Sequence, residues 1–340
     1  FPTRAYFDKG WFEKMANITM RDIGQRVGVS AVTVSKALAG RSGVGEEMRG
    51  RILRVAAELG YVNPNAAESR ALDVGILVPD RFFSMNDFYG MLYKLLVKRL
   101  ADAGHIGILE VLGEELEETL TLPRLMQNGR ADALVLLGQP KKEYLHAITR
   151  EKTPVVLLDF YDERACADAV AGDSLYGTYC LTCHLIQNGH RDIGFIGDIM
   201  LTSSIMDRYL GFYKAMLSHD LPIRAECVVR DRDRGGRLAP LALPARLPTA
   251  FVCNCDRVAV QLIEQLRTIG LRVPQDLSVV GFDDFSAECV PALSTFQIDR
   301  EAMVDAAIDL LEKQIKGAPH RRVVIGGRPV YRDSEMALGE

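Results

Sequence analysis

The sequence predicts a small all-α head followed by a larger α/β body, and three observations lead to this prediction. Between residues 18 and 40, two short amphipathic segments flank a glycine, which is typical of a helix-turn-helix. From Val74 onward, apolar runs alternate with segments of helical spacing, which indicates doubly wound parallel sheets. With 340 residues and 48% hydrophobic content, the chain is long enough for two or three domains.

The first half of the helix-turn-helix pattern covers residues 18–29. Thr19 stands where its hydroxyl can cap a helix in which Ile23 and Val27 lie four residues apart, and therefore on one face. Gly28 supplies the turn, because a residue without a Cβ atom reaches the required conformation at the lowest cost. These residues predict a short helix that ends at a tight turn.

A second helix is predicted over residues 31–38, with Ser30 as its cap. Its spacing turns Val34, Ala37 and Leu38 towards the core. The positions that face outward are Ala31, Val32, Ser35 and Lys36. A helix in this place has the shape that enters the major groove of DNA, although the pattern alone fits an ordinary helical hairpin equally well.

A third helix and a local excess of positive charge complete the head. From Glu46 to Leu59, apolar residues recur along one stripe, which predicts a helix that covers the first two. Residues 17–70 contain eight Lys and Arg against five Asp and Glu, whereas the whole chain has a net charge of −4. A basic head on an acidic body suits a protein that offers one face to DNA.

The body divides into two sets of alternating strands and helices. In the first set, we expect strands at 74–79, 106–112, 133–137 and 154–159, with helices at 88–103, 115–128 and 141–149. In the second, we expect strands at 168–172, 193–197, 227–230, 250–253 and 277–282, then closing strands at 322–325 and 330–332. Its helices are expected at 174–188, 203–219, 257–270 and 301–316.

The string VSAVTVSKAL at 29–38 resembles the N-terminal domain of the LacI/GalR family of bacterial repressors, in which the turn is followed by V-S-x-x-T-V-S-[RK]-x-L. The body resembles the same family's two-lobed, periplasmic-binding-protein-like (type I) effector domain. Its landmarks are PVVLLD at 154–159, NGHRDIGFIG at 188–197, RYLGF at 208–212, LSVVGFDD at 277–284 and PALST at 291–295. The resemblance implies a transcriptional repressor whose operator affinity is controlled by a small molecule, commonly a sugar, bound between the lobes.

We accordingly expect four regions. These are a disordered N-terminal extension at 1–17, the helix-turn-helix domain at 18–62, a hinge at 63–73, and a two-lobed effector-binding and dimerisation domain at 74–335. Met15 is interpreted as the natural start, because nothing before Ile18 has clear periodicity. The hinge departs from the family pattern, since it is two residues longer between Tyr61 and Leu72 and almost lacks the linker that normally follows.

The resemblance also implies how the protein reads double-stranded DNA. A homodimer would place one recognition helix in each half-site of an inverted repeat. The residues expected at DNA are Thr19, Ser30, Ala31, Val32, Thr33, Ser35, Lys36, Arg70 and Leu72. Leu72 is the hinge residue best suited to wedge between base pairs in the minor groove.

Ligands of such folds bind beyond the carboxyl ends of strands and between lobes. There, and by resemblance, we expect the effector site to contain Phe88, Tyr89, Asp159, Asp173, Arg208, Asn254, Asp256 and Asp283. Four of them have a plainer alternative: a cap for Asp283, a surface ion pair for Arg208, and core packing for the two aromatic residues. Cys255 stands where the family has a polar ligand contact, and Asn254 or Asp256 can substitute for it.

Other functions find no support in the sequence. The C-x-x-C-H string at 180–184 lies in an apolar helical run without an export signal, which argues against haem attachment. We find no catalytic constellation, and we expect no enzyme activity, cofactor or metal. No signal peptide or membrane span is recognisable, so we expect a cytoplasmic protein with reduced cysteines. A solute-binding receptor, the main alternative, would need a signal peptide and no helix-turn-helix.

Overall fold

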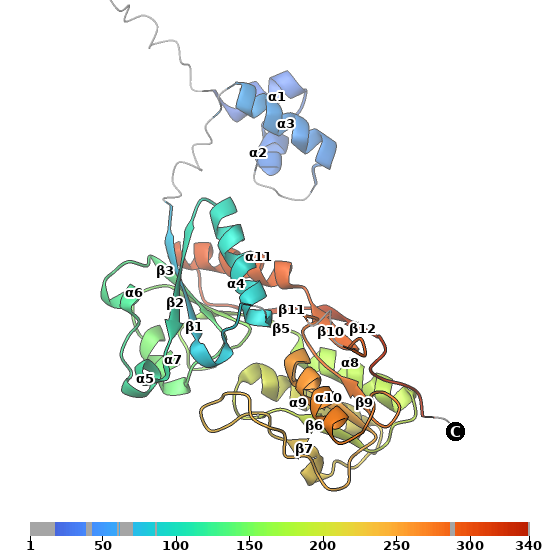
Figure 1. Ribbon diagram of the computed structural model, residues 1–340. Coiled ribbons are helices and arrows are strands. Elements are labelled where there is room, and N and C mark those ends of the chain that lie inside the picture. The colour runs from blue at the N-terminus through green and yellow to red at the C-terminus, as the bar shows by residue number, and fades with distance from the viewer. Residues whose placement is uncertain are drawn as a thin grey trace, which may run out of the picture. The chain divides into compact units, whose positions relative to one another are not determined.

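The structure is a computed structural model that describes residues 18–38, 43–59, 61, 71–85, 87–285 and 290–338. Its Cα atoms form two compact units, with residues up to 70 in the head and residues from 71 in the body. Both units are drawn in Figure 1. The predicted extension at 1–17, with Met15, and most of the predicted hinge lie outside the described residues. No helix in the described ranges is both long and apolar enough to cross a bilayer.

The head contains α1 (Met20–Val27), α2 (Ala31–Leu38) and α3 (Glu46–Glu58), which confirms the three predicted helices. Thr19 and Asp22 form a capping box at the start of α1. Gly28 ends α1 in the left-handed region with φ 82°. The Ser30 hydroxyl then accepts a hydrogen bond from the backbone N–H of Thr33 at 3.1 Å, as expected of a cap.

The core of the head is small, and Ile23, Val34 and Ile52 are each fully buried in it. One residue from each helix therefore meets at the centre. Close approach also matters at the turn, where a Cβ atom added to Gly24 of α1 would lie 2.6 Å from the carbonyl oxygen of Val29. That contact is shorter than van der Waals packing allows, so the turn requires glycine at this position.

We expect Gly24→Ala to lower the free energy of unfolding of the head by about 1–3 kcal/mol, because the turn must open to admit the methyl group. Amide hydrogen exchange of α1 and α2 in the full chain measures this effect. Gly50→Ala is the matched control, since Gly50 lies on α3 with open space around its Cβ position, and alanine favours helix there. Equal protection in the two variants would refute the packing argument.

The body consists of two lobes that are each built on a parallel sheet (Figure 1). In the first lobe, the strand order is β11-β5-β4-β3-β1-β2. Its strands are β1 (Asp73–Pro79), β2 (Ile106–Leu112), β3 (Ala133–Leu137), β4 (Val155–Leu158), β5 (Asp168–Gly172) and β11 (Arg322–Ile325). Its helices are η1 (Asp80–Phe82), α4 (Phe88–Asp102), α5 (Glu114–Thr119), α6 (Arg124–Gln127), α7 (Lys142–Thr149) and α11 (Arg300–Ile315).

In the second lobe, the strand order is β7-β6-β8-β9. Its strands are β6 (Ile193–Ile196), β7 (Val228–Val229), β8 (Ala250–Cys253) and β9 (Ser278–Val280). Its helices are α8 (Ser174–Gln187), α9 (Ser203–Ser218), η2 (Ala225–Cys227) and α10 (Asp256–Thr268). An antiparallel ribbon of β10 (Thr295–Ile298) and β12 (Gly327–Val330) lies apart from both sheets in the hydrogen-bonding pattern.

Three expectations about the body need correction. β5 and β11 pair with each other and belong to the sheet of the first lobe, not to the second set of strands. The single helix expected at 115–128 is two short helices, because Leu120 is left-handed with φ 55° and Pro123 cannot continue a helix. The strand β10 was not predicted, and β12 replaces the closing strand expected at 330–332.

Candidate functional site

On the head, the outward face of α2 is the candidate DNA surface. Ser35 and Lys36 are exposed and Val32 is 66% exposed, whereas Val34 and Ala37 are buried. Val32 leaves apolar surface exposed to water on the same face as Lys36. Contact with the groove of DNA could bury that surface. Ala31 and Thr33 are half-buried on the same short helix.

The two caps of the head are occupied by local bonds. The Thr19 hydroxyl donates to Asp22 Oδ2 at 2.7 Å, and the Ser30 hydroxyl lies 2.8 Å from that of Thr33. Both side chains therefore fix helix starts, and each can offer DNA only its remaining hydrogen-bonding capacity.

The two residues predicted to contact DNA from the hinge have different outcomes. Arg70 lies outside the described residues. Leu72 packs against the apolar core of the first lobe, and its backbone N–H donates to Nδ1 of His105 at 3.3 Å. Its carbonyl oxygen accepts a hydrogen bond from Ile106 N at 2.8 Å. In this structure Leu72 is thus part of the body at the entry to β1.

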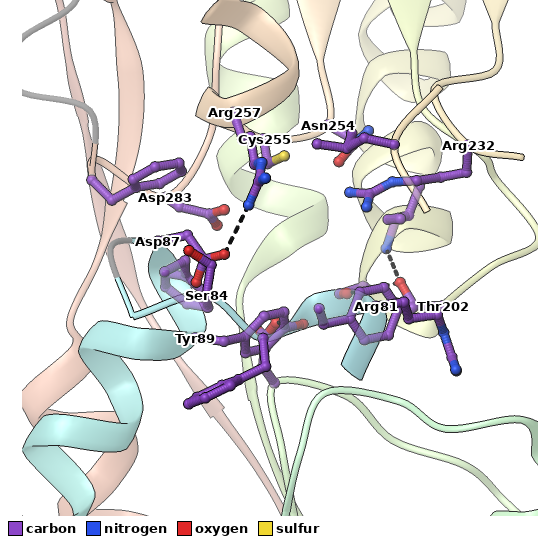
Figure 2. Close-up of a pocket in the computed structure, with 18 of the residues that line it drawn as sticks. Arg81, Ser84, Asp87, Tyr89, Thr202, Arg232, Asn254, Cys255, Arg257 and Asp283 are labelled. Carbon is purple, nitrogen blue, oxygen red and sulfur yellow. Dashed lines mark hydrogen bonds and ion pairs between the residues drawn. The ribbon is translucent and has the colours of Figure 1, made fainter. Parts of the chain in front are cut away.

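In the body, a cavity of about 370 Å³ lies between the lobes (Figure 2). Six of the eight predicted effector residues line this interlobe cavity. They are Phe88, Tyr89, Asp159, Arg208, Asn254 and Asp283. The first three belong to the first lobe, and the others are carried by α9 and by loops after β8 and β9 of the second lobe. Parallel strands thus bring distant segments to one place.

The other two predicted residues are not among those that line the cavity. Asp173 caps α8, where its carboxylate accepts a hydrogen bond from Tyr176 N at 3.2 Å. Asp256 is buried and accepts hydrogen bonds from the Thr295 hydroxyl at 2.6 Å and from Phe285 N at 3.0 Å. Their described contacts hold the fold together around the cavity.

Arg208 is at the centre of the polar network and is only 4% exposed. Its terminal nitrogens donate to Asp283 Oδ1 at 2.9 Å and to the Asn254 carbonyl oxygen at 2.6 Å. Its guanidinium also stacks 4.0 Å from the ring centroid of Phe282. A buried, multiply bonded arginine of this kind differs from the surface ion pair considered as its alternative.

Asp159 and Asp283 face this arginine from opposite lobes. Tyr89 donates its hydroxyl to Asp159 Oδ2 at 2.8 Å, whereas Asp159 Oδ1 is buried without a hydrogen-bond partner among the described residues. Both aspartates adopt positive φ, 73° at Asp159 and 104° at Asp283, a strain that is concentrated at functional sites. A buried acceptor without a partner is a place where a ligand hydroxyl can donate.

The ionisation of these groups follows from their burial. Burial raises the pKa of Asp159, although Arg208 and the Tyr89 hydrogen bond oppose that shift. Burial acts to lower the pKa of Arg208, but the nearby carboxyl groups of Asp283 and Asp159 outweigh it and raise this pKa. Arg208 is therefore charged at neutral pH.

The sequence analysis did not predict the charged residues of two ion pairs that cross between the lobes at the cavity. Asp87, the cap of α4, forms an ion pair of 3.0 Å with Arg257 across the cavity, as Figure 2 shows. Asp80 and Arg237 form a second ion pair between the lobes at 2.8 Å. Burial raises the pKa of Cys255, also in the lining, to about 12, so this cysteine is a neutral thiol.

Comparisons with known protein families agree with this two-part architecture. Residues 19–65 match the family described as "Bacterial regulatory proteins, lacI family". Residues 182–335 match the "Periplasmic binding protein-like domain". A curated relative, the HTH-type transcriptional repressor PurR of Glaesserella parasuis serovar 5, is 28% identical over 309 residues. That match covers 88% of this chain and 90% of the relative.

Two solved structures are similar to this chain over both units. The lac repressor dimer bound to operator and the anti-inducer ONPF has a TM-score of 0.63 and 21% identity. The match covers 94% of this chain and 99% of that one. The complex of the transcriptional regulator CelR with cellobiose has a TM-score of 0.67 and 22% identity, and the match covers 93% of this chain and 99% of that one. At these identities the likeness establishes the fold.

Proposed function

Because the chain belongs to the lacI family of bacterial regulatory proteins, we propose that a small molecule held between its lobes controls its affinity for operator DNA. The chain is a DNA-binding transcriptional repressor and not an enzyme. The observation that carries the proposal is the interlobe cavity. There Arg208 and Asp283 form a buried ion pair beside Asp159, whose Oδ1 has no hydrogen-bond partner among the described residues.

A sugar is the ligand class that we propose for this cavity. Hydroxyl groups can donate to Asp159 Oδ1 and to Asp283, and the aromatic ring of Tyr89 offers an apolar surface for a sugar ring. The complex of CelR with cellobiose, a structure of similar fold, supports this class. Asn254, which also lines the cavity, can supply a further polar contact.

We also propose that the protein acts in the cytoplasm as a homodimer on an inverted repeat. Each α2 would enter one major groove. Its exposed residues Val32, Ser35 and Lys36 would face the DNA, and the half-buried Ala31 and Thr33 would lie at the edge of this contact. The lac repressor structure, a dimer bound to operator, supports this arrangement. Ligand binding would change the angle between the lobes and hence the spacing of the two heads.

Thermal-shift measurements on the full chain with sugars and with selected duplex DNA test the proposal, because a ligand stabilises the state that binds it. We expect both a sugar and an inverted-repeat duplex to raise the melting temperature. Stabilisation by a sugar without any enrichment of DNA from a random pool would favour a solute-binding protein instead.

The hinge yields a separate prediction. We expect Leu72→Ala to weaken operator binding and to reduce DNA bending, because an apolar side chain inserted at a base step kinks the duplex. A circular-permutation gel measures the bend, and Ile106→Ala, at an exposed position of β2, is the control. An unchanged bend in Leu72→Ala would mean that Leu72 only packs against the first lobe, where the structure has it.

A further inference from the structure

We propose that the ligand of the interlobe cavity is a polyol that carries one anionic group, a carboxylate or a phosphate, and that Arg232 binds this anion. The inference rests on the proposed function above and specifies the ligand class of the same site. In this proposal hydroxyl groups of the ligand bind at Asp159, and its anion binds at Arg232.

Arg232 differs from the other arginines that line the cavity. Each of the others has a terminal nitrogen bonded to a carboxylate. These are Arg81 with Glu117, Arg208 with Asp283, Arg237 with Asp80, and Arg257 with Asp87. Arg232 instead uses only Nε, which donates to Asp231 Oδ2 at 3.0 Å. No hydrogen bond of its terminal nitrogens to the described part of the chain accompanies it.

The side chain of Arg232 is 10% exposed and is therefore largely removed from water. Figure 2 shows its guanidinium group turned towards Asn254 and the interior of the lining. A guanidinium presents its donors as a rigid planar fork that matches the two oxygens of a carboxylate or phosphate. The free end of this fork is thus suited to receive an anion from the cavity.

Asp231 cannot easily rotate to take up the remaining donors of Arg232. It is fully buried, and its oxygens already accept hydrogen bonds from Asp198 N at 2.7 Å and from the Asn254 side-chain amide at 2.8 Å. Asp231 therefore orients Arg232 through Nε and leaves the terminal nitrogens for another partner.

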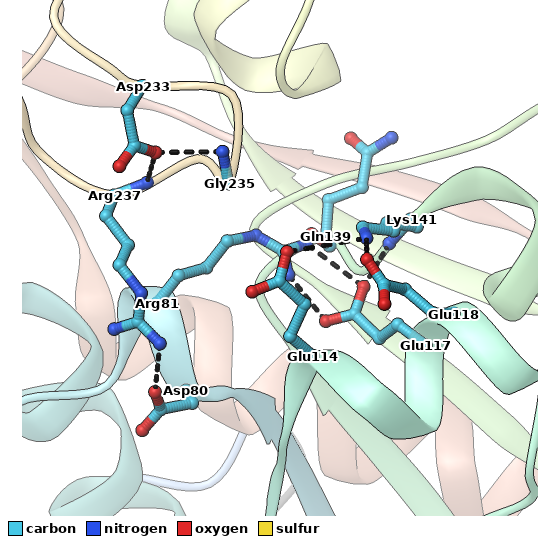
Figure 3. Close-up of polar contacts among 10 residues, drawn as sticks. All are labelled: Asp80, Arg81, Glu114, Glu117, Glu118, Gln139, Lys141, Asp233, Gly235 and Arg237. Atoms are coloured by element: carbon cyan, nitrogen blue, oxygen red, sulfur yellow. Dashed lines mark hydrogen bonds and ion pairs between the residues drawn. The ribbon is translucent and has the colours of Figure 1, made fainter.

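The segment that carries Arg232 is also fixed in place. Arg232 and Leu238 form an antiparallel bridge, and between them Asp233 Oδ1 accepts hydrogen bonds from Gly235 N and Arg237 N, each at 2.9 Å. Figure 3 shows this turn next to Arg237, whose ion pair with Asp80 ties the segment to the first lobe. An anion site on such a segment is preorganised. Because the ion pair of Arg237 with Asp80 joins this segment to the first lobe, binding of an anion there depends on how the two lobes are placed.

The part of the cavity lining around Asp159 and Asp283 needs donors. Asp159 and Asp283 are each 3% exposed, and they share one guanidinium, that of Arg208. An anion placed against these two carboxyl groups would meet acceptors and negative charge, whereas hydroxyl groups satisfy the open oxygen of Asp159. The lining therefore favours hydroxyl groups at the two aspartates and the anion at Arg232.

Isothermal calorimetry of the full chain against two matched series tests the inference. The first series is glucose, gluconate and glucose 6-phosphate, and the second is ribose, ribonate and ribose 5-phosphate. We expect an anionic member of at least one series to bind tenfold or more tightly than its neutral parent. The comparison of acid with phosphate identifies which of the two anions the site takes.

Two charge-matched variants complete the experiment. Arg232→Gln should abolish the preference for the anion over its neutral parent, because the glutamine amide carries no charge to pair with the anion. Arg246→Gln, an exposed arginine of the second lobe, should retain the preference. A preference that survives in Arg232→Gln, or a wild type that binds the neutral parents as tightly as the anions, overturns the inference but leaves the proposed function standing. If no sugar of either series binds the wild type, the inference about the anion and the proposed sugar-binding function both fail.

Discussion

Replacing Asp283 with alanine is expected to abolish the response of operator binding to the effector. The substitution removes the partner of Arg208, which then stays buried with one carboxylate fewer to compensate its charge. Breaking a buried ion pair in this way costs about 3–5 kcal/mol, so the body should also be less stable. Arg208→Ala should act in the same way, whereas DNA binding without effector should stay near normal in both, since the head is a separate compact unit.

Two further variants separate ligand binding from stability. Asp283→Asn keeps an oxygen that can accept from Arg208 and is expected to fold well, yet to respond only at much higher ligand concentration. Asp173→Asn is the matched control, because Asp173 also follows a strand but caps α8, a role that asparagine fills equally well. Operator titrations at increasing ligand concentration give the result. A normal response of Asp283→Ala would mean that the residue is purely structural.

Lys36→Ala should produce the largest effect on DNA recognition. Lys36 is exposed on α2, one turn after the exposed Val32, and is therefore placed to reach a guanine or a phosphate. We expect a loss of about 1–3 kcal/mol on the specific operator and a much smaller loss on random duplex, as for a base contact.

Fluorescence anisotropy on both duplexes at several salt concentrations measures this difference. Lys316→Ala, which removes a lysine from the body beyond α11, serves as the control. An equal loss on specific and random DNA, with a reduced salt dependence, would make Lys36 a phosphate contact and would remove it from sequence readout.

The head could be predicted almost completely from the sequence because its determinants are local. Thr19, Gly28 and Ser30 act within three residues of themselves, as a capping box, a left-handed turn and a cap. The body is different, because strand pairing joins segments that are distant in the chain. β11 pairs with β5 about 150 residues earlier, and no feature of either strand alone indicates that partnership.

The same distinction applies to the cavity. Asp159 and Asp173 both follow buried strands, yet only Asp159 lines the cavity, and its partner Tyr89 lies 70 residues away. A position after a strand therefore marks a residue as a candidate, but it does not tell whether that residue contacts a ligand or caps a helix. Arg232 escaped prediction because it stands between two aspartates in a stretch rich in charged residues, where a solvent-exposed arginine is the ordinary expectation.

We propose that a ligand in the interlobe cavity controls operator affinity. The most direct test of this claim is the dissociation constant of the full chain for an operator selected from random duplexes, measured by fluorescence anisotropy with and without each sugar of the two series. We predict that at least one sugar shifts this constant tenfold or more, and that the shift is lost in Asp283→Ala. A sugar that binds in calorimetry but leaves operator affinity unchanged would contradict the claim.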